Sequence, residues 1–223
     1  MGFIGDIMSL IYVEFPAYMF FLCKGNTMEY TQAINKLLGY IGSHPIDNYT
    51  TSMLTTHPEV ARAHTLIEEK LSHIQRKHYW FNIKRDQTLT PNSSGVITVS
   101  STVKEVFVQG KPEYVLDGGM LWDTKENTQV FSGEITADLR IEYEFMQVPE
   151  IVRDVVVYQA AEEFVIMELE DLNRAQHLNR KWASLYVELE RERIRRGQYN
   201  LYNRPIAQRI RYGVRPYHGR RVR

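Results

Sequence analysis

The sequence predicts an α+β fold: a four-helix bundle with an inserted antiparallel β domain and an extended C-terminal arm. Three observations support this prediction. Apolar residues recur at helical spacing over residues 28–78 and again over residues 149–196. Short apolar runs, separated by Gly, Pro and Asn, fill residues 79–148. Residues 197–223 interleave arginine with aromatic and aliphatic side chains, which marks them as a separate arm.

The composition is that of a globular protein. The chain has 223 residues, of which 43% are hydrophobic and 24% are charged. These values argue against a mainly disordered, collagen-like or integral membrane protein, and the length suffices for one large domain or two small ones. Cys23 is the single cysteine, so the fold contains no intrachain disulfide and no multi-cysteine zinc site.

The first helical region predicts two helices. One runs from about Met28 to Tyr40 and stops at Gly42. A turn-rich loop over residues 43–55 follows. The second helix begins at Thr56, which forms a capping box with Glu59 three residues on, and runs to about residue 78. Its buried stripe is expected at Val60, Ile67, Leu71 and Ile74.

The second helical region predicts two more helices. Pro149 opens the third helix, whose two adjacent apolar stripes indicate burial on more than one side. The fourth helix runs from about Asn173 to Arg196, with Glu188/Arg191 and Glu192/Arg196 as favourable surface pairs, and Gly197 ends it. The main stripes of these helices contain Val152, Val156, Ala160, Phe164, Met167, Ala175, Leu178, Trp182, Leu185 and Leu189.

The segment between the helical regions predicts short strands. The candidates are Tyr79–Ile83, Val96–Ser100, Glu105–Val108, Tyr114–Leu116, Met120–Trp122, Gln129–Phe131 and Glu134–Phe145. Asp117-Gly118-Gly119 is a hairpin turn signal. Alternation in the last candidate places Arg140, Glu142 and Glu144 on one face, opposite an apolar face.

Residues 1–27 form an N-terminal extension of uncertain role. The segment is apolar, but Asp6, Glu14 and Pro16 interrupt it, and a membrane-spanning helix needs about 20 apolar residues. No Lys or Arg precedes Lys24, whereas a signal peptide begins with basic residues. Two readings stay open: a segment that packs on a partner, or an upstream start codon chosen in place of Met28.

The zero net charge of the whole chain hides a strong asymmetry. Between Arg191 and Arg223 there are eleven Arg and one acid, Glu192, so this segment carries about +10 and the preceding residues about −10. Such an arm binds something anionic: nucleic acid, an acidic protein surface or the body of a neighbouring copy. Apolar and aromatic residues among the arginines argue against a purely solubilising tail. The candidate binding residues are Arg196, Tyr199, Tyr202, Arg204, Ile206, Arg209, Ile210, Arg211, Tyr212, Arg215, Tyr217, Arg220 and Arg221.

Few residues carry recognisable chemistry. The seven histidines form no i, i+4 pair, and the sequence contains no metal-binding H-E-x-x-H, no G-x-S-x-G and no phosphate-binding glycine loop. Glu142 and Glu144 form a possible carboxylate pair, which keeps a tail-associated cell-wall or polysaccharide hydrolase as an alternative. A second alternative is a non-specific DNA-binding protein, because the arm can neutralise phosphates. The favoured prediction is a structural protein that is not an enzyme and uses no cofactor or metal.

Several segments resemble the tail tubular protein A family of short-tailed bacteriophages. Residues 33–42, AINKLLGYIG, are similar to the opening of that family, and Trp80-Phe81-Asn82 resembles the end of its IQ..GW.FN segment. His78 and Tyr79 stand where that segment usually has glycine. Further matches are Leu89-Thr90-Pro91, Gly95-Val96-Ile97, Leu121-Trp122-Asp123, Pro149, Tyr158, Ala160-Ala161 and Phe164. The resemblance runs from about Met28 to Leu189, which favours Met28 as the usual start.

The resemblance implies a head-to-tail adaptor of the virion. In that family, twelve copies form a ring beneath the portal protein, the ring carries the tail nozzle (a tail tubular protein B-like protein), and genomic DNA passes through the centre during ejection. We therefore expect a dodecamer at the head–tail junction, assembled in the host cytoplasm without a membrane. The bundle is expected to form the ring and contact DNA transiently, the β domain to face the nozzle, and residues 197–223 to bind the portal.

Overall fold

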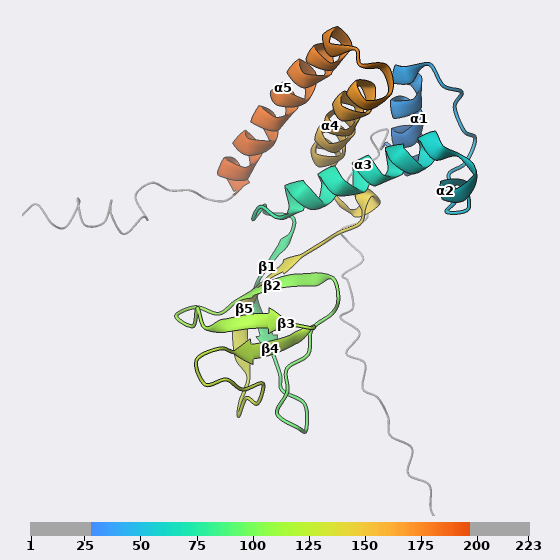
Figure 1. Ribbon diagram of the computed structural model, residues 1–223. Helices are drawn as coiled ribbons and strands as arrows, with labels where there is room; N and C mark the ends of the chain where they lie inside the picture. Colours follow the sequence, from blue (N-terminus) through green and yellow to red (C-terminus); the bar gives the residue numbers. More distant parts are fainter. Residues whose placement is uncertain (1–27, 197–223) are drawn as a thin grey trace, which may run out of the picture.

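The computed structural model describes residues 28–196, with the helices at one end and the strands at the other (Figure 1). The α+β class is confirmed. The elements in chain order are α1 (Tyr30–Ile41), α2 (Met53–Thr56), α3 (Pro58–Gln75), β1 (Ile83–Leu89), β2 (Val103–Phe107), β3 (Tyr114–Asp117), β4 (Met120–Asp123), β5 (Ile135–Ile141), a 3₁₀ helix (Phe145–Gln147), α4 (Glu150–Leu169) and α5 (Leu172–Arg196). The described residues thus contain five α-helices instead of the expected four.

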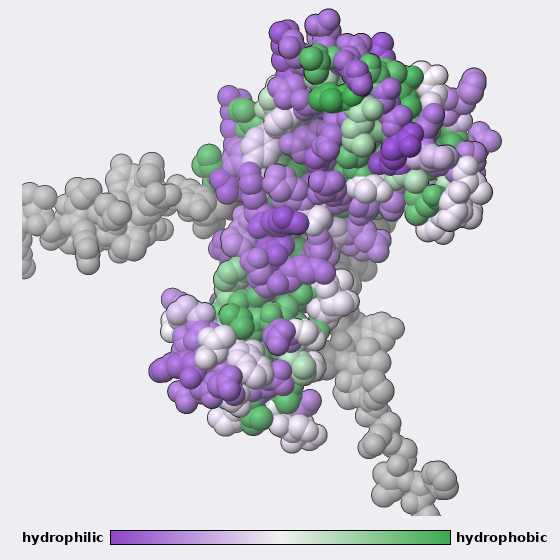
Figure 2. All heavy atoms as spheres, in the orientation of Figure 1, coloured by the Kyte–Doolittle hydropathy of each residue, from purple (hydrophilic) through white to green (hydrophobic). Residues whose placement is uncertain are grey.

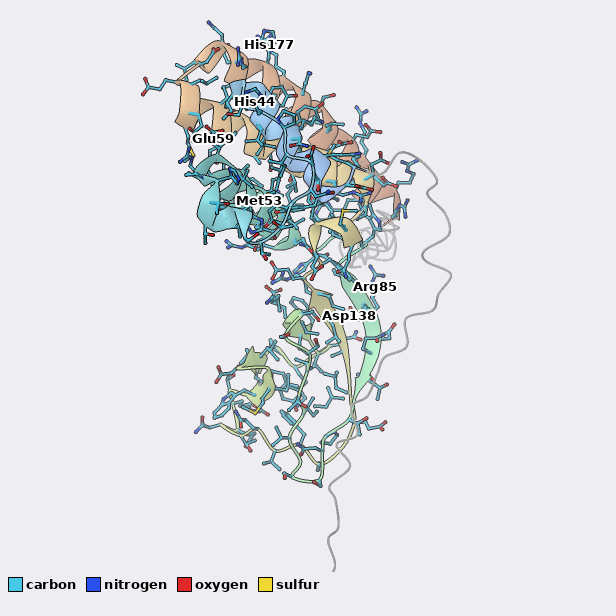
Figure 3. All side chains as sticks on the ribbon, turned by 90° about the vertical axis from the view of Figure 1, so that its right-hand side faces the viewer. His44, Met53, Glu59, Arg85, Asp138 and His177 are labelled. Atoms are coloured by element: carbon cyan, nitrogen blue, oxygen red, sulfur yellow. The ribbon has the colours of Figure 1, made fainter. Side chains whose placement is uncertain are left out.

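The N-terminal helices differ from the prediction at one boundary. Gly42 ends α1 in the left-handed conformation, as predicted. The predicted loop over residues 43–55 includes most of the one-turn helix α2, and Thr56 is the last residue of α2. The expected capping box with Glu59 is therefore wrong: Pro58 is the first residue of α3, and the Glu59 carboxylate accepts a hydrogen bond from the Ser43 hydroxyl. Figure 3 labels Glu59 on α3, His44 in the loop after α1 and Met53, the first residue of α2.

The helical core lies where α1, α3, α4 and α5 meet. Pro149 precedes α4 as predicted, and the buried side chains of α4 face more than one neighbouring helix. Met167 is an exception to the expected stripes, since it is 55% exposed near the end of α4. The other buried positions of the core include Ile34, Leu37, Val60, Ile67, Leu71, Ile74, Val152, Val156, Ala160, Phe164, Leu178 and Leu189.

The strands form a three-stranded antiparallel sheet in the order β1-β5-β2 and a separate β3–β4 hairpin. The predicted hairpin turn is confirmed, because Asp117 pairs with Met120 and both Gly118 and Gly119 have positive φ. A second, smaller core lies between the sheet and the hairpin; it contains Ile97, Val103, Val106, Leu121, Phe131, Ala137, Leu139 and Ile141.

Four of the predicted strands are wrong or shorter than expected. Tyr79–Ile83 is not a strand: its first residues form a turn, and β1 begins at Ile83. Residues 96–100 and 129–131 contribute only isolated bridges. The last strand ends at Ile141, because the next residues leave the sheet for the 3₁₀ helix. The alternating pattern also placed Arg140 on the polar face of the last strand, but the structure buries its side chain.

Candidate interaction surfaces

Most of the arm residues that the sequence predicts for binding lie outside the described residues. These are Tyr199, Tyr202, Arg204, Ile206, Arg209, Ile210, Arg211, Tyr212, Arg215, Tyr217, Arg220 and Arg221. Arg196 is described, and it is the last residue of α5. The structure therefore shows the point at which the arm leaves the helical part.

Arg196 is held against the body of the protein by two contacts. Its Nε and Nη2 atoms lie 2.7 and 2.6 Å from Glu192 Oε1, so the predicted Glu192–Arg196 pair is confirmed. Its guanidinium carbon lies 5.2 Å from the centre of the Trp80 ring, which is a cation–π distance. Trp80 belongs to the turn between α3 and β1, so the last residue of α5 contacts the connection between the helices and the strands.

A second set of contacts joins the same turn to α5. The Tyr79 hydroxyl donates a hydrogen bond to Glu190 Oε1 at 2.7 Å, and Glu190 also pairs with Arg193 at 2.7 Å. Burial raises the pKa of Tyr79, and the hydrogen bond to Glu190 raises that pKa further, so the hydroxyl remains a donor. Sequence reasoning missed this role of Tyr79 because it placed the residue in a strand.

The helical part and the sheet are joined by two side-chain amides. Gln75 Nε2 donates to the Tyr143 carbonyl at 2.8 Å, and the Tyr143 N–H donates to Gln75 Oε1 at 2.7 Å. Asn82 Nδ2 donates to the carbonyls of Gln75 and Lys77, while its Oδ1 accepts from the Tyr79 N–H at 2.9 Å. Both amides are fully buried, so these bonds fix the two connecting segments relative to each other.

Arg140 adds a charged group to this junction. Its Nη1 donates to the Gln75 carbonyl at 3.1 Å, and its Nη2 donates to Glu105 Oε1 at 2.9 Å. His78 Nε2 lies 3.2 Å from the other oxygen of Glu105. The hydrogen bond from Arg140 is the main cause that lowers the pKa of Glu105, with a smaller contribution from His78. Elsewhere in the sheet, Arg85 and Asp138 lie on the paired strands β1 and β5 (Figure 3).

The carboxylate pair expected on the last strand does not form. Glu142 lies just beyond β5, where its carboxylate contacts Lys104 Nζ at 3.3 Å. Glu144 precedes the 3₁₀ helix and takes part in a capping box with Gln147. The two acids therefore occupy different local structures, and each has its own partner. Neither acid lies on β5, so the shared strand face on which the hydrolase alternative placed them does not extend to these residues.

His64 on α3 packs against two tyrosines. His64 Nδ1 lies 2.5 Å from the Tyr30 hydroxyl and 3.1 Å from the Tyr49 hydroxyl, and its ring stacks on Tyr49. Burial raises the pKa of Tyr30, and Glu68 raises it further. Within residues 28–196, no group of three or more His, Cys, Asp or Glu side chains is arranged to hold a metal ion. Cys23 lies outside this range.

The comparison with protein families agrees with the resemblance seen in the sequence. The profile of the family described as Tail tubular protein matches residues 31–205. The chain belongs to the tail tubular protein family. It is thus a structural protein of a bacteriophage tail. The match spans α1 to α5, including all five strands, and extends into the arm. Among curated protein sequences, none matches this chain.

The structure gives one further observation about this tail protein. None of the helices in the described part of the chain is both long enough and apolar enough to span a lipid bilayer.

Proposed function

We propose that this tail tubular protein is a head-to-tail adaptor: copies form a ring between the portal and the tail nozzle, and genomic DNA passes through the ring. By resemblance to the tail tubular protein A family, the ring contains twelve copies. The helical part forms the ring, the strand region faces the nozzle, and the arm over residues 197–223 binds the portal. In these assignments, the helical part contains residues 28–78 and 149–196, and the strand region contains residues 79–148.

The observation that carries the proposal is the family match together with the charge asymmetry. The match includes the first residues of the arm. The arm over residues 197–223 contains seven Arg and no acid; together with the end of α5, the chain from Arg191 onward carries about +10, against about −10 for the preceding residues. An acidic body suits a channel for DNA, because like charges repel and the duplex slides without adhering. Arginine and tyrosine in the arm suit docking on an acidic protein groove.

Truncation after Gly197 tests the role assigned to the arm. The truncated chain should fold like the full chain, because the described residues include both hydrophobic cores. It should not attach to the portal protein of the same phage, as judged by sedimentation of the mixture. A matched control changes the seven Arg residues between Arg204 and Arg223 to Lys, which keeps the charge but removes bidentate pairing. Normal attachment of the truncated chain would contradict the proposal.

The DNA-binding alternative predicts a different result. If phosphate neutralisation were the role of the arm, the full chain would bind double-stranded DNA with an affinity that falls steeply as salt rises. The adaptor proposal predicts that DNA binding by the isolated chain is weak at physiological salt, whereas portal binding persists. Titration with DNA and with portal at the same series of salt concentrations separates the two functions.

A further inference from the structure

The α4–α5 hairpin carries two exposed surfaces of opposite charge. The first, called here the tip surface, lies where α4 turns into α5, and its exposed apolar side chains are Ile166, Met167, Leu169 and Leu172. Figure 2 shows hydrophobic atoms gathered at this end of the helical part, where Figure 1 places the turn. The second, called the stem surface, lies toward the other end of α5 and contains Val187, Arg191, Ile194 and Arg195.

The tip surface is acidic. Residues 162–171 contain five acids and no basic residue. Four of these acids have partners: Glu168, Glu163 and Asp171 pair with Arg62, Lys70 and Arg174, and Glu162 accepts hydrogen bonds from Asn179 and Trp182. Within residues 28–196, Glu170, which is exposed at the turn itself, is the acid of this segment without such a partner. Glu170 is also one of the described residues other than glycine with positive φ, at 53°, so the chain keeps an acid where glycine is ordinarily favoured. An apolar patch with an acidic border of this kind marks a protein contact.

The stem surface is basic. Residues 187–196 contain four Arg and three Glu, so the excess of positive charge is one. Glu188 is exposed, and among residues 28–196 the expected Glu188–Arg191 pair does not form. Within residues 28–196, Arg193 and Arg196 have carboxylate partners on α5, whereas Arg191 and Arg195 have none and point to solvent. Val187 and Ile194 are seven residues apart on α5, so they lie on one side of the helix together with Arg191. Both are at least half exposed.

From these two surfaces we infer that the tip surface of one copy binds the stem surface of the next copy. Apolar side chains on each surface would be removed from water, and Glu170 of the tip would face the unpaired Arg191 and Arg195 of the stem. A contact of tip against tip would instead bring two Glu170 carboxylates together. A contact between two different surfaces of one chain repeats from copy to copy, and it closes into a ring when the rotation from one copy to the next is a whole fraction of a turn.

This inference deepens the proposed function and rests on it for closure of the ring. Leu172 and Val187 are separated by fifteen residues of α5, or about 22 Å along the helix axis. A contact between tip and stem therefore directs the α4–α5 hairpin from one neighbour toward the next. The remaining surfaces, including the strand region, stay free for the portal, the nozzle and DNA.

Complementation between two defective variants tests the contact. Leu172→Asp damages only the tip, and Arg191→Glu with Arg195→Glu damages only the stem. Each variant alone should form no ring, but an equimolar mixture should form one-to-one dimers, since one intact tip and one intact stem remain. Mass photometry should show at least a tenfold increase in dimer over either variant alone. Formation of rings by either variant alone, or a mixture that stays monomeric while wild type assembles, would overturn the inference.

Cross-linking tests the same contact in the full chain, with and without portal. In a Cys23→Ser background, Leu172→Cys combined with Val187→Cys should give a ladder of covalent multimers under oxidation. The matched control replaces Val187→Cys with Thr65→Cys, at an exposed position on α3, and should give no ladder. Rings without the ladder would overturn the contact but leave the adaptor role intact. If the Leu172→Asp variant forms normal rings but no longer binds the nozzle, the tip surface binds the nozzle. That result would also overturn the inferred contact between tip and stem.

Discussion

The helical part and the strand region differ in how much of their cores is removed from water. The helical core contains 23 buried apolar residues, many of them with no exposed surface. The strand core contains eight, of which several keep a few per cent of their surface exposed. Because a small core stabilises a fold less, the strand region depends more on its hydrogen-bonded junction with the helices. The helical part is therefore expected to be stabilised mainly by its own core, and the strand region by its junction as well.

The largest effect is expected for Phe164→Ala in the helical core. The Phe164 side chain is fully buried on α4. Its loss removes apolar contacts and leaves a cavity, which should lower the free energy of unfolding by about 4 kcal/mol. Urea denaturation followed by far-UV circular dichroism measures the change. A loss below about 1 kcal/mol would contradict the view that this core supports the whole molecule.

A smaller and local effect is expected for Leu121→Ala in the strand core. Leu121 is fully buried on β4, and its truncation should cost about 3 kcal/mol. The loss should appear as faster amide hydrogen exchange in residues 83–141, while α3, α4 and α5 keep their protection. Equal loss of protection in both regions would show that the two cores unfold as one unit.

The junction should be sensitive to Asn82→Ala. This change removes the donor to the Gln75 and Lys77 carbonyls and the acceptor for the Tyr79 N–H. Leaving buried polar groups unpaired should cost about 2 kcal/mol. Small-angle X-ray scattering should also show a wider range of orientations of the strand region. An unchanged scattering profile together with unchanged stability would indicate that Asn82 does not hold the junction.

The smallest effect is expected from the titration of Glu105. The pKa of Glu105 is lowered below its ordinary value of 4.5, mainly by the hydrogen bond from Arg140. A carboxyl with a lowered pKa in the folded state stabilises the fold above its unfolded pKa, and this contribution is lost as the pH falls through the lowered value.

Glu105 is 43% exposed on its side chain, so solvent screening keeps its contribution small. In wild type, the free energy of unfolding should decrease more steeply below pH 4.5 than in Glu105→Gln, which has no proton to gain at this position. Denaturation at a series of pH values compares the two slopes. Parallel curves for the two proteins would contradict a stabilising role for the ionised carboxyl.

Local signals in the sequence predicted much of the fold. Gly42 ends α1, Pro149 precedes α4, and Gly118-Gly119 turns the β3–β4 hairpin, because each depends on backbone conformations that few residue types favour. The prediction failed at Thr56, since Pro58 fixes the start of α3 and Ser43, far back in the sequence, engages Glu59. A spacing rule does not see such a distant partner.

Longer-range contacts explain the other differences. Arg140 looked like a solvent-facing strand residue, but Glu105 and the Gln75 carbonyl pair its guanidinium and allow burial. The aromatic run from Tyr79 looked like a strand, yet Tyr79 and Trp80 anchor α5. Composition was enough to find the basic arm. The opposed tip and stem surfaces could be recognised only after the structure showed which side chains of α4 and α5 face solvent.

Electron microscopy of the full chain mixed with the portal protein tests the adaptor role most directly. We expect a closed ring of this chain seated on one end of the portal, with an open axial channel. Class averages along the axis would also count the copies, for which twelve is the expected number. If the chain stays separate from the portal at every ratio and salt concentration, or binds without forming a ring, the adaptor role is wrong.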